Sequence, residues 1–240
     1  MIEIKGLKKS FGKLEVLNNI SLQIVSNESY ALIGPNGCGK TTLIKSILGM
    51  VIPDYGDIIL EKSSILNQFE YRKTIGYMPQ IGHYPSNMTI GHIIDMVKEI
   101  RNTSEKIDED LFFAFQLNKI LNKKMSTLSG GTTQKVSAFL AFMFDPNLLI
   151  LDEPTAGLDP ISSEILKEKI ITERNKGKTI IITSHILSEL DEMISRLIYM
   201  QEGNILFDLS IDELKKETQE DKVSKAIAHI LKKQHHVENY

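Results

Sequence analysis

Hydrophobic and polar positions along the chain form two kinds of pattern, one typical of strands and one typical of helices. Short apolar or alternating runs predict strands at 2–4, 20–24, 30–33, 58–60, 148–151, 179–183, 197–201 and 205–207. The runs 148–151 and 180–182 are apolar at every position, so neither face of these strands is suited to water. Such runs are typical of central parallel strands that carry helices on both faces.

Apolar residues at helical spacing predict helices at 40–49, 89–101, 108–117, 160–175 and 185–194, with Thr89 and Asp108 as N-caps and Gly177 as a stop signal. Strand patterns are absent from the sequence between 82 and 133. We therefore expect an α/β core formed by 1–81 and 134–217, a helical lobe inserted at 82–133, and a helical tail at 218–240.

Composition narrows the class of protein. The chain has 240 residues, 42% of them hydrophobic, and a formal net charge of −3, so we expect no nucleic-acid partner. Cys38 is the only cysteine, which excludes an internal disulfide and is typical of a reducing compartment. No signal peptide is evident. The longest nearly apolar run, 136–144, is far shorter than the roughly 20 residues that span a bilayer, so we expect a buried helix there.

A glycine-rich loop lies between the predicted strand 30–33 and the predicted helix 40–49. It matches the pattern G-x4-G-K-[ST], and its residues are Gly34, Pro35, Asn36, Gly37, Cys38, Gly39, Lys40 and Thr41, followed by Thr42. Backbone N–H groups of such a loop and the helix N-terminus bind phosphate oxygens. Lys40 can neutralise the β- and γ-phosphates, and the Thr41 hydroxyl can ligate Mg²⁺. The alternative is a glycine turn that binds no phosphate, and the flanking strand and helix disfavour it.

Two carboxylates follow the apolar run 148–151. Asp152, at the end of the predicted buried strand, can face a magnesium ion. Glu153 can polarise a water molecule in line with the γ-phosphate, and such general-base assistance contributes roughly 10²–10⁴-fold. The alternative is that Glu153 is a solvated acid before the turn at Pro154. The phosphate-binding loop upstream disfavours this alternative.

A second glycine-rich turn, Leu128-Ser129-Gly130-Gly131, opens the helix that contains 136–144. This turn can bind phosphate but has no lysine of its own. The economical interpretation is that Ser129, Gly130 and Gly131 close over a nucleotide held by another copy of the same domain.

Together with Ala156-Gly157-Leu158-Asp159 and His185, these motifs have the order and spacing of ABC-type ATPase domains, and the chain resembles that family over residues 2–217. The resemblance implies an α/β phosphate-loop NTPase core: a mostly parallel sheet flanked by helices, an N-terminal antiparallel β part and an inserted helical subdomain. It implies ATP and Mg²⁺ as cofactors.

The resemblance also assigns roles to four further residues. Gln80 corresponds to the glutamine that contacts the metal and the attacking water, and Asp159 to the residue that communicates between the two sites of a dimer. His185 corresponds to the histidine that contacts the γ-phosphate, and Phe11 to the aromatic that stacks on adenine.

Three positions depart from the family pattern. Thr132 replaces the usual glutamine after the second glycine turn, Phe11 replaces the more usual tyrosine, and Cys38 lies inside the phosphate loop. The serine and glycines expected to meet phosphate are intact. A thiol reagent that reaches Cys38 should block nucleotide binding.

The family resemblance implies an ATP-hydrolysing subunit that dimerises head to tail around two Mg·ATP molecules. The expected partner is a separately encoded membrane permease, with the chain a peripheral homodimer on the inner face of the cell membrane. The length of the chain is similar to that of ATPase subunits in export systems of the ABC-2 class. Within that class, residues 128–189 are most similar to the accessory ATPase of nitrous-oxide reductase maturation, which is linked to copper-site assembly. The alternative is a soluble ABC ATPase that acts on a non-membrane target, such as a ribosome-associated switch or a cofactor-assembly factor.

Overall fold

The computed structural model describes residues 1–101 and 107–237 and divides the chain into two compact units. The first unit comprises Met1–Gln68 and Thr183–Tyr240, and the second comprises Phe69–Ile182. This division differs from the lobe expected at 82–133, whose boundaries stay a prediction. No helix within the described parts of the chain is long and apolar enough to cross a membrane.

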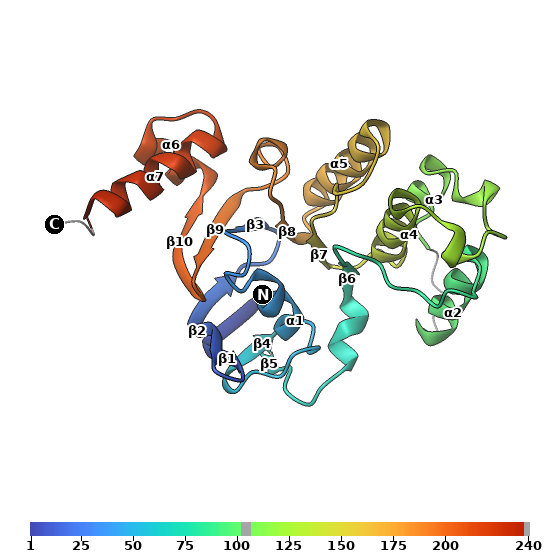
Figure 1. The fold of residues 1–240 in the computed structure, drawn as a ribbon, viewed down its shortest axis with the longest axis horizontal. Helices are drawn as coiled ribbons and strands as arrows, with labels where there is room; N and C mark the ends of the chain where they lie inside the picture. Colours follow the sequence, from blue (N-terminus) through green and yellow to red (C-terminus); the bar gives the residue numbers. More distant parts are fainter. Residues whose placement is uncertain (102–106, 238–240) are drawn as a thin grey trace. The chain divides into compact units, whose positions relative to one another are not determined.

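An antiparallel sheet in the first unit is formed by β2 (Leu14–Ile24), β1 (Ile2–Phe11), β4 (Tyr55–Leu60) and β5 (Ser63–Ser64), in that order (Figure 1). Ile2 of the central strand β1 lies opposite Ile24 on one side and Leu60 on the other. The hairpin β1–β2 and strand β4 extend further than the predicted runs 2–4, 20–24 and 58–60, because polar residues alternate with the buried apolar ones at their ends.

The same unit contains the strand and helix on either side of the glycine-rich loop. Strand β3 (Ser29–Ile33) is buried throughout and pairs in parallel with β9 (Arg196–Gln201), which forms a hairpin with β10 (Asn204–Ser210). Helix α1 (Lys40–Ile47) begins directly after the loop. These elements confirm the predictions for 30–33, 40–49, 197–201 and 205–207.

Two helices end the described chain. Helix α6 (Ile211–Thr218) begins with a capping box in which Ser210 and Glu213 exchange hydrogen bonds, and α7 (Val223–Val237) packs against α6 (Figure 1). The start of α6 could have been predicted from the Ser-x-x-Glu pattern. Helix α7 confirms the helical pattern of the tail.

The helix predicted at 185–194 is wrong. Only η4 (Leu187–Glu189), a single 3₁₀ turn, forms there. The apolar residues that suggested a helix, Leu190, Met193 and Ile194, are buried, but turns with i→i+3 hydrogen bonds bring them inside. Periodic burial alone therefore does not distinguish a helix from successive 3₁₀ turns.

In the second unit, β7 (Leu148–Asp152) lies between β6 (Ile75–Met78) and β8 (Thr179–Thr183), the last residue of which belongs to the first unit. Strands β7 and β8 are buried throughout, as their apolar runs predict, and β6 pairs in parallel with β7. Strand β6, preceded by η1 (Glu70–Thr74), was missed because its short run is interrupted by Gly76.

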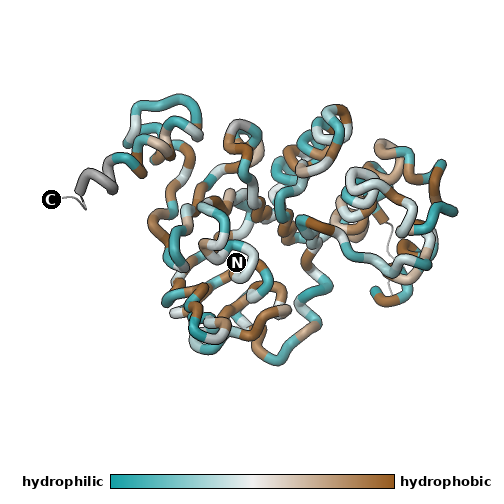
Figure 2. Tube along the Cα trace, in the orientation of Figure 1, coloured by the Kyte–Doolittle hydropathy of each residue, from teal (hydrophilic) through white to brown (hydrophobic). Residues whose placement is uncertain are grey.

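The other elements that the structure describes in the second unit are helices. They are α2 (Ile90–Arg101), α3 (Asp110–Ala114), η2 (Leu117–Lys119), η3 (Met125–Thr127), α4 (Gly130–Phe142) and α5 (Pro160–Asn175). The predicted cap Thr89 accepts a hydrogen bond from the N–H of His92, whereas Asp108 lies before the observed cap Glu109 of a shorter helix than expected. Figure 2 shows hydrophobic and hydrophilic residues mixed along α5.

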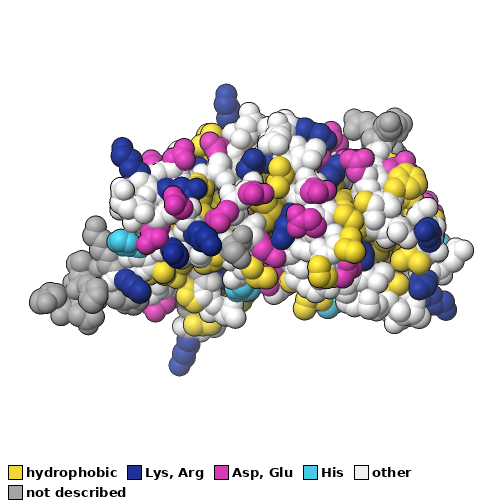
Figure 3. Space-filling view, turned by 90° about the horizontal axis from the view of Figure 1, so that it is seen from above, with side chains coloured by type: hydrophobic (Ala, Val, Ile, Leu, Met, Phe, Trp, Pro, Cys, Tyr) yellow, Lys and Arg dark blue, Asp and Glu magenta, His cyan; other side chains and the backbone are white. Residues whose placement is uncertain are grey.

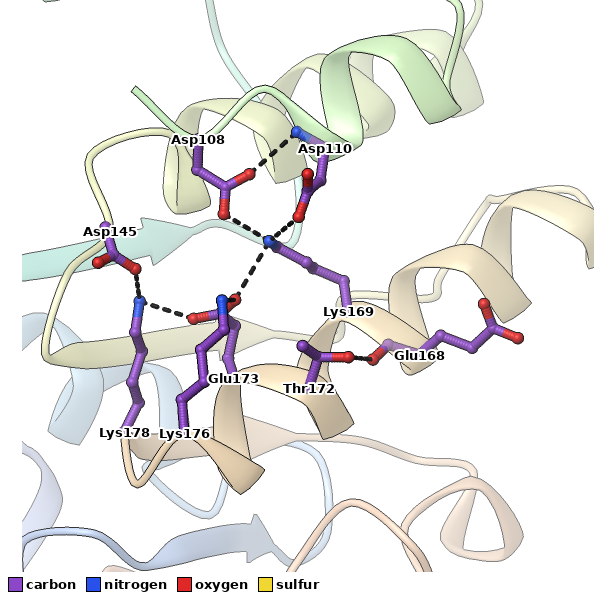
Figure 4. A network of polar contacts seen from close by, with 9 residues as sticks. All are labelled: Asp108, Asp110, Asp145, Glu168, Lys169, Thr172, Glu173, Lys176 and Lys178. Carbon is purple, nitrogen blue, oxygen red and sulfur yellow. Dashed lines mark hydrogen bonds and ion pairs between the residues drawn. The ribbon is translucent and has the colours of Figure 1, made fainter. Parts of the chain in front are cut away.

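A cluster of charged side chains joins α5 to the start of α3 and to the segment before β7 (Figure 4). The side chains of Lys169 and Glu173 are 5% and 1% exposed. Lys169 contacts Asp108, Asp110 and Glu173, and Glu173 is also paired with Lys176 and Lys178. Burial raises the pKa of the Glu173 carboxyl, but its hydrogen bonds to the three lysines outweigh that effect and lower the pKa to about 2.

On the face drawn in Figure 3, basic and acidic side chains are interspersed. This distribution agrees with the near balance of 28 basic and 31 acidic residues in the sequence.

Candidate functional site

The glycine-rich loop between β3 and α1 holds its lysine internally. Lys40 Nζ donates to the carbonyl oxygens of Gly34 and Pro35, at 2.8 and 3.0 Å, and its side chain is buried. Gly39 has φ +111°, and a Cβ there would lie 2.7 Å from the carbonyl oxygen of Val16 on β2, so glycine is required. The loop thus holds the Lys40 ammonium group against two of its own backbone carbonyl oxygens.

The remaining loop residues are divided between surface and interior. Pro35, Asn36 and Gly37 are exposed, and Thr41, in the first turn of α1, is exposed as well. Cys38 is buried, with Sγ 3.9 Å from Lys40 Nζ. The exposed stretch is open to a ligand, whereas the thiol lies behind it.

Two other predicted residues of the first unit lie at ends of strands. Phe11 ends β1 and is 51% exposed, and Lys9 Nζ lies 5.4 Å from the centre of its ring. His185 is exposed and follows β8 after Ser184. Both rings are accessible to a ligand.

In the second unit, parallel pairing of β6 with β7 brings Gln80 and Glu153 together. Met78 lies opposite Leu151 in the register, so the residues that follow the two strands emerge at the same edge. Gln80 Nε2 donates to Glu153 Oε2 at 2.8 Å. Glu153 itself has φ +50°, a backbone conformation that is unusual for glutamate.

Asp152, the last residue of β7, is buried beside this pair. Tyr77 of β6 lies close enough that burial, together with the charge of Asp152, raises the pKa of the tyrosine hydroxyl to about 12. The tyrosine therefore stays neutral, and the local negative charge is that of the carboxylates.

The second glycine turn forms the start of α4. Ser129 is the N-cap and accepts a hydrogen bond from the N–H of Thr132 at 3.3 Å. A Cβ on Gly131 would lie 2.7 Å from the carbonyl oxygen of Gly157, so the turn packs closely against the loop that precedes α5. Asp159, in that loop, is the N-cap of α5 and pairs with Lys135 of α4 at 2.8 Å.

The predicted site residues are thus divided between the two units. Phe11, His185 and the glycine-rich loop belong to the first unit. Gln80, Asp152, Glu153, Asp159 and the turn 129–131 belong to the second. Sequence reasoning missed Lys135 and Tyr77, because no spacing rule connects Lys135 with Asp159 or Tyr77 with Asp152.

Comparison with known proteins gives a family and a fold. The ABC transporter family model matches residues 17–156. A lantibiotic transport ATP-binding protein of Streptococcus pyogenes is 35% identical over 212 residues, which cover 88% of this chain and 92% of the relative. The Nod factor export ATP-binding protein I of Rhizobium sp. (strain N33) is 35% identical over 213 residues, which cover 85% of this chain and 69% of the relative.

Two solved structures are similar over most of the chain. An ATP-binding subunit of an ABC transporter has a TM-score of 0.88 and 26% identity, and the match covers 96% of this chain and 99% of that one. A dimeric ATP-binding cassette in a post-hydrolysis state with ADP and phosphate has a TM-score of 0.78 and 22% identity, covering 88% and 99%, and shows the same fold. The expected α/β fold, with its N-terminal antiparallel sheet, is confirmed. The chain belongs to the ABC transporter family, as an ATP-binding subunit that hydrolyses ATP to energise transport.

Proposed function

We propose that two copies of this chain close head to tail around two Mg·ATP molecules and that Glu153 is the general base of hydrolysis. The observation that carries the assignment of Glu153 is its contact with Gln80 at the edge of β6 and β7. The amide of Gln80 donates to one oxygen of the Glu153 carboxylate and so restricts the orientation of that side chain.

The donor set suits magnesium. Because Gln80 uses its amide nitrogen on Glu153, its side-chain oxygen is the atom left for a cation. This oxygen, the carboxylate of Asp152 and the exposed hydroxyl of Thr41 are the hard oxygen donors that Mg²⁺ prefers. The family resemblance assigns the metal to these three residues, where it would neutralise charge on the phosphates.

Nucleotide contacts are divided between the two copies in this proposal. The loop 34–42, with Lys40, holds the phosphates in one copy, and Phe11 stacks on the adenine. Ser129, Gly130 and Gly131 of the other copy complete the γ-phosphate site. His185 contacts the γ-phosphate, and Asp159 connects the two sites. A solved cassette of the same fold is described as a dimer with ADP and phosphate, which supports this arrangement.

The proposed partner is a separately encoded membrane permease, on which a homodimer docks at the inner face of the cell membrane. The names of the two relatives, one for lantibiotic transport and one for Nod factor export, support an export system of the ABC-2 class. A role in nitrous-oxide reductase maturation is the narrower form of this proposal, and it rests on the similarity of 128–189 alone. A soluble target is the competing form, and it predicts that the native complex contains no integral membrane protein.

Substitution of Glu153 tests the proposal. Glu153→Gln should bind ATP and form a stable ATP-dependent dimer, with turnover lowered roughly 10²–10⁴-fold. Glu164→Gln, which alters an exposed carboxylate of α5, is the matched control and should turn over at the parental rate. A Glu153→Gln protein with parental turnover would exclude Glu153 as the base.

Mixing two inactive variants tests the shared sites. Lys40→Ala should lose tight ATP binding, and Ser129→Arg should lose closure over the partner's nucleotide. A heterodimer of the two retains one intact site, formed by Lys40 of one copy and Ser129 of the other, so hydrolysis should reappear on mixing. No recovery at any ratio would count against sites that work independently.

A further inference from the structure

Thr132 lies at the third position of α4, where family members usually have glutamine. In a capping box, glutamine at this position reaches back to the backbone N–H of the N-cap residue. The threonine side chain is too short for that bond. Its hydroxyl instead lies 2.9 Å from Ser129 Oγ, the atom that we place at the partner's γ-phosphate.

The contact with Thr132 affects which hydrogen bonds the Ser129 hydroxyl can still form. A serine hydroxyl has one proton to donate and two lone pairs that accept. Ser129 Oγ already accepts the N–H of Thr132 at 3.3 Å. If the Thr132 hydroxyl donates to it as well, both lone pairs are used, and the only remaining capacity of Ser129 is its own proton. Phosphate oxygens accept hydrogen bonds, so this proton is what an incoming nucleotide needs.

The surroundings keep the two hydroxyls together. Ser129 is held as the N-cap of a helix of 13 residues, and Gly131 between the two side chains packs against Gly157. Thr132 is half-buried, whereas Ser129 is exposed. The threonine is therefore placed to support the serine from within its own subunit, and the serine is accessible to a second copy.

We propose that Thr132 is a positioning residue that orients the Ser129 hydroxyl to donate to the γ-phosphate of ATP bound by a second copy of the chain. This role rests on the head-to-tail dimer of the proposed function. It acts through the partner's site, so it affects ATP-dependent closure and leaves nucleotide binding to the free subunit unchanged.

The test uses the Glu153→Gln protein, in which turnover should be too slow to reopen the dimer during the measurement, and determines the ATP-dependent dimer dissociation constant by sedimentation. Thr132→Val removes the hydroxyl and keeps the shape of the side chain. One lost orienting hydrogen bond should weaken each composite site about fivefold, hence a dimer closed at two sites about 25-fold. Thr132→Ser should restore closure, and binding of ADP to the subunit should match the parent in both variants.

Two control variants show whether a weaker dimer results from loss of the contact between Ser129 and Thr132. Ser129→Ala should weaken the dimer at least as much as Thr132→Val, because it removes the donor itself. Thr133→Val removes the neighbouring hydroxyl of the same turn, and its dimer should match the parent. Melting temperatures of all variants separate loss of closure from loss of folding.

The outcomes distinguish failure of the Thr132 role from failure of the head-to-tail dimer. If Ser129→Ala weakens the dimer and Thr132→Val leaves it unchanged, the role of Thr132 is overturned. A tighter dimer with Thr132→Val also overturns it, because Thr132 would then be withdrawing the serine proton. If the Glu153→Gln protein does not dimerise with ATP at all, the composite site fails, and the role of Thr132 fails with it.

Discussion

Lys135 of α4 and Asp159 of the loop before α5 form an ion pair, with 2.8 Å between Nζ and Oδ2. Asp159 also accepts hydrogen bonds from the backbone N–H and the hydroxyl of Ser162. The Lys135 hydrogen bond, followed by the contacts with Ser162, holds the pKa of the Asp159 carboxyl well below its usual range. Helix α4, which Ser129 caps, is thereby connected to the residue proposed to communicate between sites.

Removal of this connection should affect activity more than stability. Lys135→Met leaves Asp159 as the cap of α5 but frees it from α4, so we expect the ATPase rate to fall several-fold. The melting temperature should change little, because exposed ion pairs contribute little to stability. Lys135→Arg preserves the charge and is the control. Equal impairment of the two variants would show that the shape of lysine, rather than its pairing with Asp159, is what matters.

The two glycines at the start of α4 should differ sharply in their tolerance of alanine. A Cβ on Gly131 would lie 2.7 Å from the carbonyl oxygen of Gly157, whereas a Cβ on Gly130 would have no heavy atom within 4 Å. Gly131→Ala should therefore destabilise the chain by about 1–3 kcal/mol, the usual cost of overpacking. Gly130→Ala should melt at or slightly above the parental temperature. Urea unfolding of both variants measures the difference, and equal stabilities would contradict the close contact.

Local sequence rules predicted most elements of this fold but not the contacts between them. The apolar runs at 148–151 and 180–182 identified β7 and β8, because a strand that is buried on both faces is apolar at every position. Strand β6 was missed and a helix was wrongly expected at 185–194, because in both places tertiary packing decides the structure of a short segment. The pairing of Gln80 with Glu153 depends on the β6–β7 register, which the residues themselves do not specify.

The thiol of Cys38 should react slowly in the native chain. The side chain is 4% exposed, so a maleimide reaches it only when the loop opens. Once attached, the bulky group should abolish ATP binding, because Lys40 Nζ lies 3.9 Å from the sulfur. Cys38→Ala should bind ATP within a few-fold of the parent and resist the reagent, which nucleotide-binding assays after timed labelling can check. Reagent-sensitive ATP binding in Cys38→Ala would place the reaction elsewhere.

Lowering the pH should reduce the stability of the folded chain through protonation of Glu173. Its carboxyl has a pKa of about 2 in the folded protein, below the ordinary value of 4.5, so folding favours the ionised form. A lowered carboxyl pKa contributes stability that is present above about pH 4.5 and is lost as the pH falls toward 2. Burial lowers the pKa of Lys169, but its hydrogen bonds to Asp108, Asp110 and Glu173 raise it overall, so the lysine stays charged throughout this range.

Glu173→Gln should therefore be destabilised at neutral pH and approach the parent in acid. Removal of one partner from a buried ion pair costs about 3–5 kcal/mol, because Lys169, Lys176 and Lys178 lose the carboxylate that they share. Below about pH 4.5 the Glu173 carboxyl of the unfolded parent binds a proton, so the difference between the two proteins should shrink as the pH falls toward 2. Glu168→Gln alters an exposed carboxylate of the same helix and should match the parent at every pH. Urea unfolding at pH 7, 4 and 3 measures all three proteins, and a difference that stays constant with pH would show that Glu173 acts through packing rather than through its charge.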